Sequence, residues 1–572
     1  MPNLPSKPSI SSMPADYHLR RQEVVNRIAA AAVQLPLLDS KLWFHHDIRD
    51  NFYYASYLLA AAALQDEPSP SISEDREAAK RAASSILLEV LRLQDVNPES
   101  STYGHWPLRL EPSLAEAPYN TLPVELMGLL MVYLYKQYGA VMDETLRSAF
   151  ETALHHAYKS GYYRKPLKQY NHHEAKYTAA KLIYGQLYAD AELLEDGLQS
   201  LRATLAFTKE NGMLEYGSLP WFWHWVQAYT CAWELAEEGS ELRAVLAELL
   251  DLLWEERSDY YLGGAWAGPH SRGQGHDIPR DANVLLDYVQ FGNFALPAAM
   301  PRTEYAGFLF YEAPELARRK ALSREVVPVE VKKLVPRLAG DGLLGSPHHS
   351  YVYITEHYAV GGMWERAAEF DNEQHRWDIT LPLDAVVSGS GNQGYFFNPG
   401  DGSWDGDPRH QSEYCEVLLH ENVVMALYPL PSEGEIRGIL PLGDWQYEER
   451  ALYGFAGGVY WSVQLMLPYE VKVQAGGLLV SSRGIAGGVV VEVLHAEEAA
   501  ALGVDSLEAF AAASRKAPAV FQQVDGAAGV EVEYTSLRGN KLHLRTSGAV
   551  YGALSADARV NGRLIDWESY RR

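Results

Sequence analysis

The chain has 572 residues, of which 47% are hydrophobic and 11% aromatic, and its formal net charge is −25 at pH 7. This length exceeds one ordinary core, so we expect two or three domains, and the apolar content excludes a disordered chain. The acidic balance argues against nonspecific nucleic-acid binding, which needs a broad basic surface, but it allows an anionic small ligand held by a few local cations.

The number of cysteines and the lack of long apolar runs exclude further classes of protein. Cys231 and Cys415 cannot build a disulfide framework, and neither has metal-ligand spacing. Residues 1–21 contain no apolar signal core, and no run of about 18 apolar residues occurs, so we expect a cytoplasmic protein without a membrane span. The 14 Trp and 36 Tyr suit clefts that stack on sugar rings, although a large aromatic core is the alternative explanation.

The first part of the chain has helical periodicity. Apolar residues recur at steps of three and four, and Gly139, Gly161, Gly212 and Gly239 stand where helices should end in a left-handed residue. Short connections make successive helices antiparallel, and successive hairpins can close into a ring. The pattern predicts helices over 20–35, 51–65, 74–93, 121–139, 143–161, 173–190, 191–212, 221–239 and 241–258.

After residue 345 the pattern becomes strand-like. Short segments alternate or run apolar between Gly, Pro, Asn and Asp residues, and one helix is predicted over 505–516. The predicted strands lie within 350–360, 376–387, 413–420, 422–430, 457–467, 469–484, 487–495 and 540–548. We therefore predict an α+β multidomain protein with an N-terminal arm (1–20), an (α/α) toroid of helical hairpins (21–313), a linker (314–345) and a C-terminal antiparallel β-sandwich (346–572).

A helical hairpin ring followed by an antiparallel sandwich resembles the (α/α)-toroid polysaccharide lyases, meaning the heparinase II/III, alginate and hyaluronate/chondroitin lyase families. The resemblance covers nearly the whole chain, but a fold by itself does not define an activity. It implies cleavage of a uronic-acid polymer by β-elimination. That reaction needs a group that neutralises the C6 carboxylate, a base for the C5 proton and an acid for the leaving oxygen.

The stretch Asn171-His172-His173-Glu174 stands at a predicted helix start. In the lyases that the chain resembles, an Asn or an Asn-His pair on a toroid helix neutralises the substrate carboxylate, so we expect Asn171 or His172 to donate to it. Glu174 would orient an imidazole and set its tautomer, and His173 would contact the substrate. The alternative is a helix cap, with Asn171 bonded to backbone N–H groups and the histidines facing water.

A second polar and aromatic segment covers residues 211–229. Its 215–217 turn (Glu-Tyr-Gly) is similar to a Glu-Gly turn of the heparinase-type lyases, with a Tyr inserted. Tyr216 and Tyr229 are therefore both candidates for the catalytic tyrosine. His224 lies between them among tryptophans, as a catalytic candidate or as an ordinary core residue.

The 263–277 segment is too rich in glycine for a helix and too polar for a buried loop. Its glycines would let the backbone approach a ligand closely. Arg272 is the candidate for a bidentate carboxylate clamp, and His270 is a candidate substrate contact. The alternative is a polar surface turn in which Arg272 forms a structural salt bridge.

Further candidate contacts lie outside these segments. Trp106 would be a stacking platform beside His105, and Trp221 would be a sugar contact. His357 and His375 would support the site from the sandwich, because several of the lyases that the chain resembles borrow a histidine from there. No Cys/His cluster has zinc spacing, so we expect no cofactor, and a structural divalent metal in the sandwich stays open.

We therefore expect a polysaccharide or oligosaccharide lyase acting on an anionic uronic-acid glycan, with no nucleic-acid or membrane partner; a homo-oligomer stays open. One alternative is an (α/α)-barrel glycoside hydrolase acting on glucuronyl-type sugars through two carboxylates roughly 5–9 Å apart. The other is a noncatalytic glycan-binding protein. The catalytic candidates, among which the sequence does not separate base from acid, are Asn171, His172, His224, Tyr216, Tyr229 and Arg272.

Overall fold

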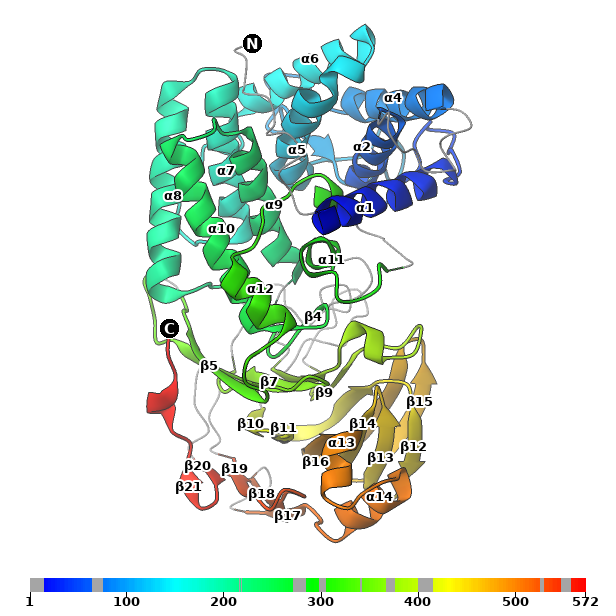
Figure 1. Cartoon of the computed structure of the whole chain (residues 1–572), viewed down its shortest axis with the longest axis vertical. Coiled ribbons are helices and arrows are strands. Elements are labelled where there is room, and N and C mark those ends of the chain that lie inside the picture. Colours follow the sequence, from blue (N-terminus) through cyan, green and yellow to red (C-terminus); the bar gives the residue numbers. More distant parts are fainter. Residues whose placement is uncertain are drawn as a thin grey trace. The chain divides into compact units, whose positions relative to one another are not determined.

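The computed structural model describes residues 15–63, 76–215, 217, 219–270, 284–297, 305–339, 342–366, 376–399, 415–524, 529–546 and 557–572 (Figure 1). These residues fall into two compact units. The helical unit lies within 1–209, 220–255 and 281–314, and the strand unit lies within 210–219, 256–280 and 315–572. Helices followed by antiparallel sheets confirm the predicted fold class.

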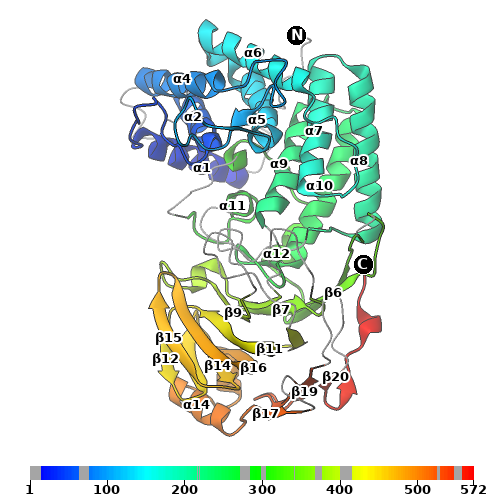
Figure 2. The same ribbon diagram turned by 180° about the vertical axis from the view of Figure 1, so that it is seen from behind.

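Antiparallel helices build the helical unit, as the coloured ribbons of Figures 1 and 2 show. Two contacts show that α7 and α8 run in opposite directions. Lys181 of α7 contacts Asp196 of α8, and Gly185, later on α7, lies against Leu194, which is earlier on α8. None of the described helices is both long and apolar enough to cross a membrane. The helices are α1 (Ala15–Val33), α2 (Ile48–Ala63), α4 (Arg76–Arg92), α5 (Leu122–Tyr138), α6 (Glu144–Ser160), α7 (His172–Leu187), α8 (Ala191–Asn211), α9 (Leu219–Leu235), α10 (Glu241–Asp259) and α11 (Leu285–Phe291).

Three of the four helix-ending glycines have the expected conformation. Gly161, Gly212 and Gly239 have φ values of 63°, 82° and 75°, which disfavour side chains. Gly139 differs, with φ of −58°, because the chain there continues into a short 3-10 turn over Gly139–Val141. A right-handed residue is sufficient at that position.

Helices α5 and α7 form the interior of the helical unit. Every residue from Pro123 to Leu134 on α5 is buried, and α7 is buried along most of its length. The absence of a side chain at Gly128 lets α5 approach closely, since an added Cβ would lie 3.0 Å from the Tyr184 hydroxyl of α7. Polar residues on these two helices therefore need partners within the unit.

Two long strands organise the strand unit. β11 (Val423–Leu440) and β16 (Gly477–His495) pair with each other over almost their whole length, with a register shift between Pro429 and Gly434. The first part of β11 pairs with β10 (Glu416–His420), and its last part pairs with β9 (Gln393–Phe397). β16 likewise pairs first with β15 (Tyr469–Gln474) and then with β14 (Val459–Leu465).

The other strands extend this pair on both sides. The large sheet has the order β12-β13-β14-β16-β11-β9-β8-β7-β6-β5, and a second sheet has the order β17-β18-β19-β20-β21. Segment 314–345, predicted as a linker, contributes α12 (Glu315–Leu322) and β5 (Val329–Val335), which pairs with β6. The remaining bounds are β1 (Trp106–Pro107), β2 (Tyr119–Asn120), β3 (Tyr261–Leu262), β4 (Ala265–Trp266), β6 (His348–Ile354), β7 (Ala359–Met363), β8 (Trp377–Thr380), β12 (Asp444–Tyr447), β13 (Ala451–Ala456), β17 (Val520–Gln523), β18 (Val530–Thr535), β19 (Lys541–Arg545), β20 (Asp557–Val560), β21 (Arg563–Leu564), α13 (Ala496–Ala501) and α14 (Leu507–Arg515).

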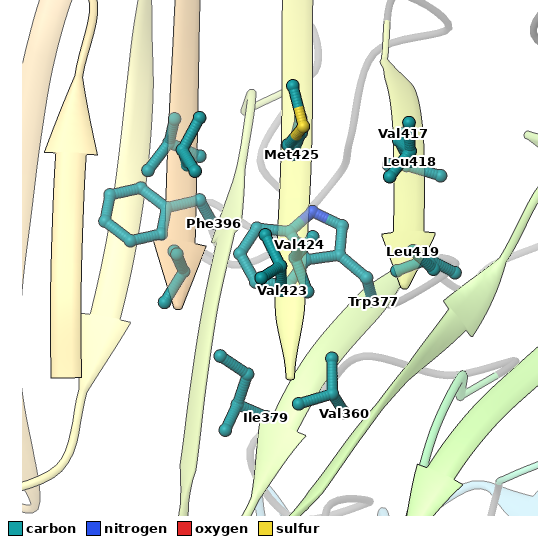
Figure 3. Packing of buried hydrophobic residues seen from close by; sticks show 14 of the residues in the cluster. Val360, Trp377, Ile379, Phe396, Val417, Leu418, Leu419, Val423, Val424 and Met425 are labelled. Atoms are coloured by element: carbon teal, nitrogen blue, oxygen red, sulfur yellow. The ribbon is translucent and has the colours of Figure 1, made fainter. Parts of the chain in front are cut away.

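The core of the strand unit lies over the first part of β11. Trp377, Phe396 and Val360 gather there with Val424 and Met425, as Figure 3 shows. The Trp377 and Phe396 rings are stacked with centroids 6.3 Å apart. Each fully buried side chain of this kind stabilises the fold by about 1.5–3 kcal/mol. Because side chains alternate between the two faces of a strand, a shift of one residue in strand pairing would lose this burial, and the pairing register is therefore fixed.

A buried carboxylate connects the two sheets. Glu492 on β16 is fully buried and accepts hydrogen bonds from the Tyr534 hydroxyl (2.6 Å), the Leu537 amide (3.0 Å) and the Asn422 side chain (3.2 Å). Burial raises the pKa of Glu492 to about 7, although these donors and Arg538 oppose the shift. The carboxyl group therefore keeps its proton in the folded protein at pH values where an exposed Glu has lost it.

We expect Glu492 to make the strand unit less stable as pH rises. Between the ordinary pKa of 4.5 and about 7, the folded chain holds a proton that the unfolded chain has released, so this group's stabilisation is complete below that range and is lost as pH passes through it. The loss is roughly 3 kcal/mol. Glu492→Gln, which mimics the protonated acid, should flatten this slope in denaturant unfolding at pH 5, 6, 7 and 8. Parallel pH profiles for the two proteins would contradict the assignment.

Candidate functional site

The stretch 171–174 begins α7, and its capping geometry fixes where the helix starts. The Asn171 side chain accepts a hydrogen bond from the Glu174 amide at 3.1 Å, as an N-cap residue does. The Glu174 carboxylate accepts the backbone amides of Lys168, Gln169 and Tyr170 at 2.7–2.9 Å. Glu174 therefore holds the chain that enters α7, and the predicted role of orienting an imidazole belongs to another residue.

That residue is Glu125 on α5. His173 Nδ1 donates to one Glu125 oxygen at 2.7 Å, and Lys176 Nζ lies 2.6 Å from the same oxygen. The Tyr177 hydroxyl donates to the other oxygen at 2.5 Å. His173, Lys176 and Tyr177 follow the i, i+3, i+4 spacing, so one face of α7 presents all three donors to one carboxylate.

The electrostatics of this cluster keep Glu125 ionised. Burial alone would raise the pKa of Glu125, which is 3% exposed, but Lys176 and His173 hold it well below its usual range. Burial, followed by the Glu125 charge, raises the pKa of the Tyr177 phenol, so its hydroxyl remains a hydrogen-bond donor. A buried charge with three donors is well compensated, whereas removal of one partner is costly.

The hydrogen bond to Glu125 determines the chemistry of His173. A carboxylate accepts only from a protonated nitrogen, so Nδ1 carries the proton and Nε2 of the neutral ring carries the lone pair. The His173 side chain is 34% exposed, while the Glu125 side chain behind it is 3% exposed. His173 is therefore a base with a defined tautomer and access to solvent.

A pocket of about 450 Å³ opens beside His173. Its walls carry Lys165 and Lys168, and the Lys165 ammonium donates to the Tyr177 hydroxyl at 3.0 Å. The Lys165 carbonyl in turn accepts a hydrogen bond at 3.0 Å from Lys181, a buried lysine on α7. The pocket lining, all within the helical unit, is Thr121, Leu122, Glu125, Lys165, Pro166, Lys168, Gln169, Asn171, His173, Glu174 and Tyr177.

His172, next to His173 on α7, belongs to a row of stacked aromatic rings. Its ring is 4.0 Å from the His173 ring and stacks on Trp221 at 4.8 Å with an interplanar angle of 14°. The His224 ring lies 5.8 Å away on the same helix as Trp221. His172 and His224 are each 8% exposed, so the predicted histidines do come together but as a largely buried stack.

Three predicted residues are core residues of the helical unit. Tyr229 is fully buried, and burial raises the pKa of its phenol. Trp106 is also fully buried and donates its indole N–H to the Val90 carbonyl, so it cannot stack on a sugar. His105 is 6% exposed and is bonded through Nδ1 to the Tyr103 carbonyl. Tight packing against neighbouring helices overrides the polar appearance of these residues in the sequence.

The predicted residues in the strand unit have other partners. His270 is fully buried, with Nδ1 2.5 Å from the Gly217 carbonyl and Nε2 3.0 Å from Asp378, so both ring nitrogens are already engaged. The ring of His357 is stacked face to face on His495 at 3.4 Å, beside Glu497. One ligand atom each of His357, His495 and Glu497 lies within 4.8 Å of the other two, so this group could hold a metal ion. Tyr216, Arg272 and His375 lie outside the described residues.

The sequence analysis missed Glu125, Lys165, Lys176 and Tyr177. A usable signal existed on α7, since Lys176 and Tyr177 follow His173 by three and four residues and so share its helix face. No comparable signal marks Glu125, which stands 48 residues before His173 in an apolar helix. An isolated Glu in an otherwise buried helix indicates only that some partner must exist.

No family model matches the chain, and no curated protein matches it. Among solved structures, it is similar to a chondroitinase AC lyase whose structure was determined in complexes with oligosaccharides, with 9% identity, a TM-score of 0.45 and coverage of 92% of this chain and 90% of that chain.

We expect Glu125 and Lys176 to be strongly coupled. Glu125→Gln removes the carboxylate that faces a buried ammonium and should cost about 3–5 kcal/mol of unfolding free energy. Lys176→Met should cost less alone, because His173 and Tyr177 still donate to Glu125. The double variant should recover part of the loss in a double-mutant cycle measured by urea unfolding. Simple additivity of the two single changes would contradict the coupling.

Proposed function

We propose that the helical unit carries a lyase site that cleaves a uronic-acid-containing oligosaccharide or polysaccharide by β-elimination. The observation that carries the proposal is the hydrogen bond from His173 Nδ1 to the buried Glu125 carboxylate, with His173 on the wall of the pocket. This pair provides a base whose lone pair is on Nε2. The pocket volume of about 450 Å³ is in the range of small-ligand sites and suits one or two sugar residues.

The first step is proton abstraction next to a carboxylate. Lys165 and Lys168 bring positive charge to the pocket wall, where they can hold the C6 carboxylate and make the C5 proton more acidic. His173 Nε2 takes the C5 proton, and the electron pair of the C5–H bond becomes available to C4. The imidazolium that forms is stabilised by Glu125, which stays ionised throughout.

The second step breaks the glycosidic bond. The electron pair forms the C4–C5 double bond, the C4–O bond breaks, and its electrons go to the leaving oxygen. The imidazolium returns its proton to that oxygen when both lie on the same side of the ring, so the enzyme ends in its starting state. The Tyr177 hydroxyl accepts a hydrogen bond from Lys165 and donates one to Glu125. Hydrogen bonds therefore connect a lysine that can hold the substrate carboxylate to the residue that orients the base.

The state of the pocket carboxylates favours elimination over the rival hydrolysis. Retaining and inverting hydrolases need one carboxylic acid that is protonated and a second carboxylate as nucleophile or base. The two acids among the described pocket residues are Glu125, whose low pKa keeps it ionised, and Glu174, which holds three backbone amides. Neither is placed to give a proton to a glycosidic oxygen.

We expect His173→Ala to lower kcat by at least about 100-fold, because it removes the base. The measurement is the near-ultraviolet absorbance of the unsaturated product on a panel of uronic-acid oligosaccharides. His155→Ala, at an exposed histidine on α6, is the matched control and should keep full activity. New reducing ends without absorbance would favour the hydrolase, and binding without either product would favour a noncatalytic glycan-binding protein.

We expect Lys165→Met to lower kcat/KM by about 10-fold or more on a free uronate, because a charge-assisted contact to the carboxylate is lost. A substrate methyl-esterified at C6 has no charge to neutralise and serves as the matched control substrate. The variant and the wild type should process that ester with similar kcat/KM. An equal loss on both substrates would show that Lys165 acts through the fold and does not hold the carboxylate.

A further inference from the structure

The base in the pocket is held by two different kinds of contact. The hydrogen bond between His173 Nδ1 and Glu125 fixes one point of the imidazole ring. The ring can still rock about its Cβ–Cγ bond within the reach of that hydrogen bond, and such a turn would move Nε2 across the pocket. The His172 ring, 4.0 Å away with an interplanar angle of 38°, lies against His173 and blocks that turn.

His172 is itself held in place by a larger aromatic surface. Trp221 on α9 stacks on it at 4.8 Å and 14°, and His172 is 8% exposed. Two adjacent helix residues would normally point in different directions around α7, so their close ring contact needs outside support. The indole provides that support, because a buried His172 ring packed between two aromatic rings has few alternative arrangements.

We propose that the Trp221–His172–His173 stack is a positioning device, in which His172 sets the ring plane of the base and provides a π-face beside the imidazolium that forms when His173 takes a proton. The proposal rests on the proposed function for the role of His173 as base. His172 is then a positioning residue that acts through His173, which differs from the catalytic role expected for it from the sequence.

Cation–π attraction gives this arrangement a catalytic consequence. A cationic ring is attracted to a neighbouring aromatic face, and this attraction exists only after proton transfer. Interactions that strengthen only along the reaction raise kcat and leave substrate binding almost unchanged. The stack should therefore affect kcat much more than KM.

The test compares three replacements of His172 in the full-length protein. His172→Phe keeps a flat aromatic face, His172→Leu fills a similar volume without one, and His172→Ala does neither. We expect Phe to retain most of kcat, while Leu and Ala lower kcat by about 10-fold with KM nearly unchanged. A purely structural filling role would instead make Leu and Phe equivalent, and that result would overturn the proposal.

A second readout does not depend on activity. The His173 ring-proton signals in an NMR spectrum of histidine-labelled protein carry a ring-current shift from the stack, which should persist in His172→Phe and be lost in His172→Leu. An unchanged signal in all variants would overturn the proposed stack, even if no substrate is turned over. An inactive wild type with the expected shifts would contradict only the lyase assignment. A His172→Phe protein that keeps the shift but loses activity would show that the His172 nitrogens act directly, against the proposal.

Discussion

The candidate site depends on one buried charge, the Glu125 carboxylate. An ionised carboxylate inside a helical core is tolerated only when donors replace its lost hydration, and α7 provides three of them from a single face. This requirement fixes α5 against α7 in one register. It also fixes the tautomer of His173, so the same interaction that stabilises the helix pair prepares a base at the pocket wall.

Local chain geometry makes that register possible. Asn171 and Glu174 cap α7 so that the helix begins at His172, which places His173, Lys176 and Tyr177 on the side that faces α5. Lys181, one turn beyond Tyr177, holds the Lys165 carbonyl. The helix cap and the chemistry are therefore not competing explanations of the 171–174 stretch, because the cap is what orients the chemically active residues.

The strand unit follows the same rule for buried charge with a different outcome. Among the residues that the structure describes, Glu492 has neutral donors and no direct ion pair, so burial dominates and its pKa rises to about 7. Glu125 has an ammonium and an imidazole within 2.7 Å, so attraction dominates and its pKa falls. A direct ammonium partner therefore separates the charged acid from the one whose pKa rises. Asp378, fully buried with His270 Nε2 at 3.0 Å, follows Glu492, because burial outweighs the imidazole contact and raises its pKa.

The sequence by itself determined the order of helices and strands, because the 3.6- and 2-residue periodicities of burial are local properties of each segment. It also located α7's start and the polar stretch at its head. Only the tertiary structure decided which polar residues meet: it joined Glu125 to His173 across 48 positions, and it placed Tyr229, Trp106 and His105 in the core. The physical reason is that a buried polar group is defined by its partner, and partners on neighbouring helices leave no mark on sequence spacing.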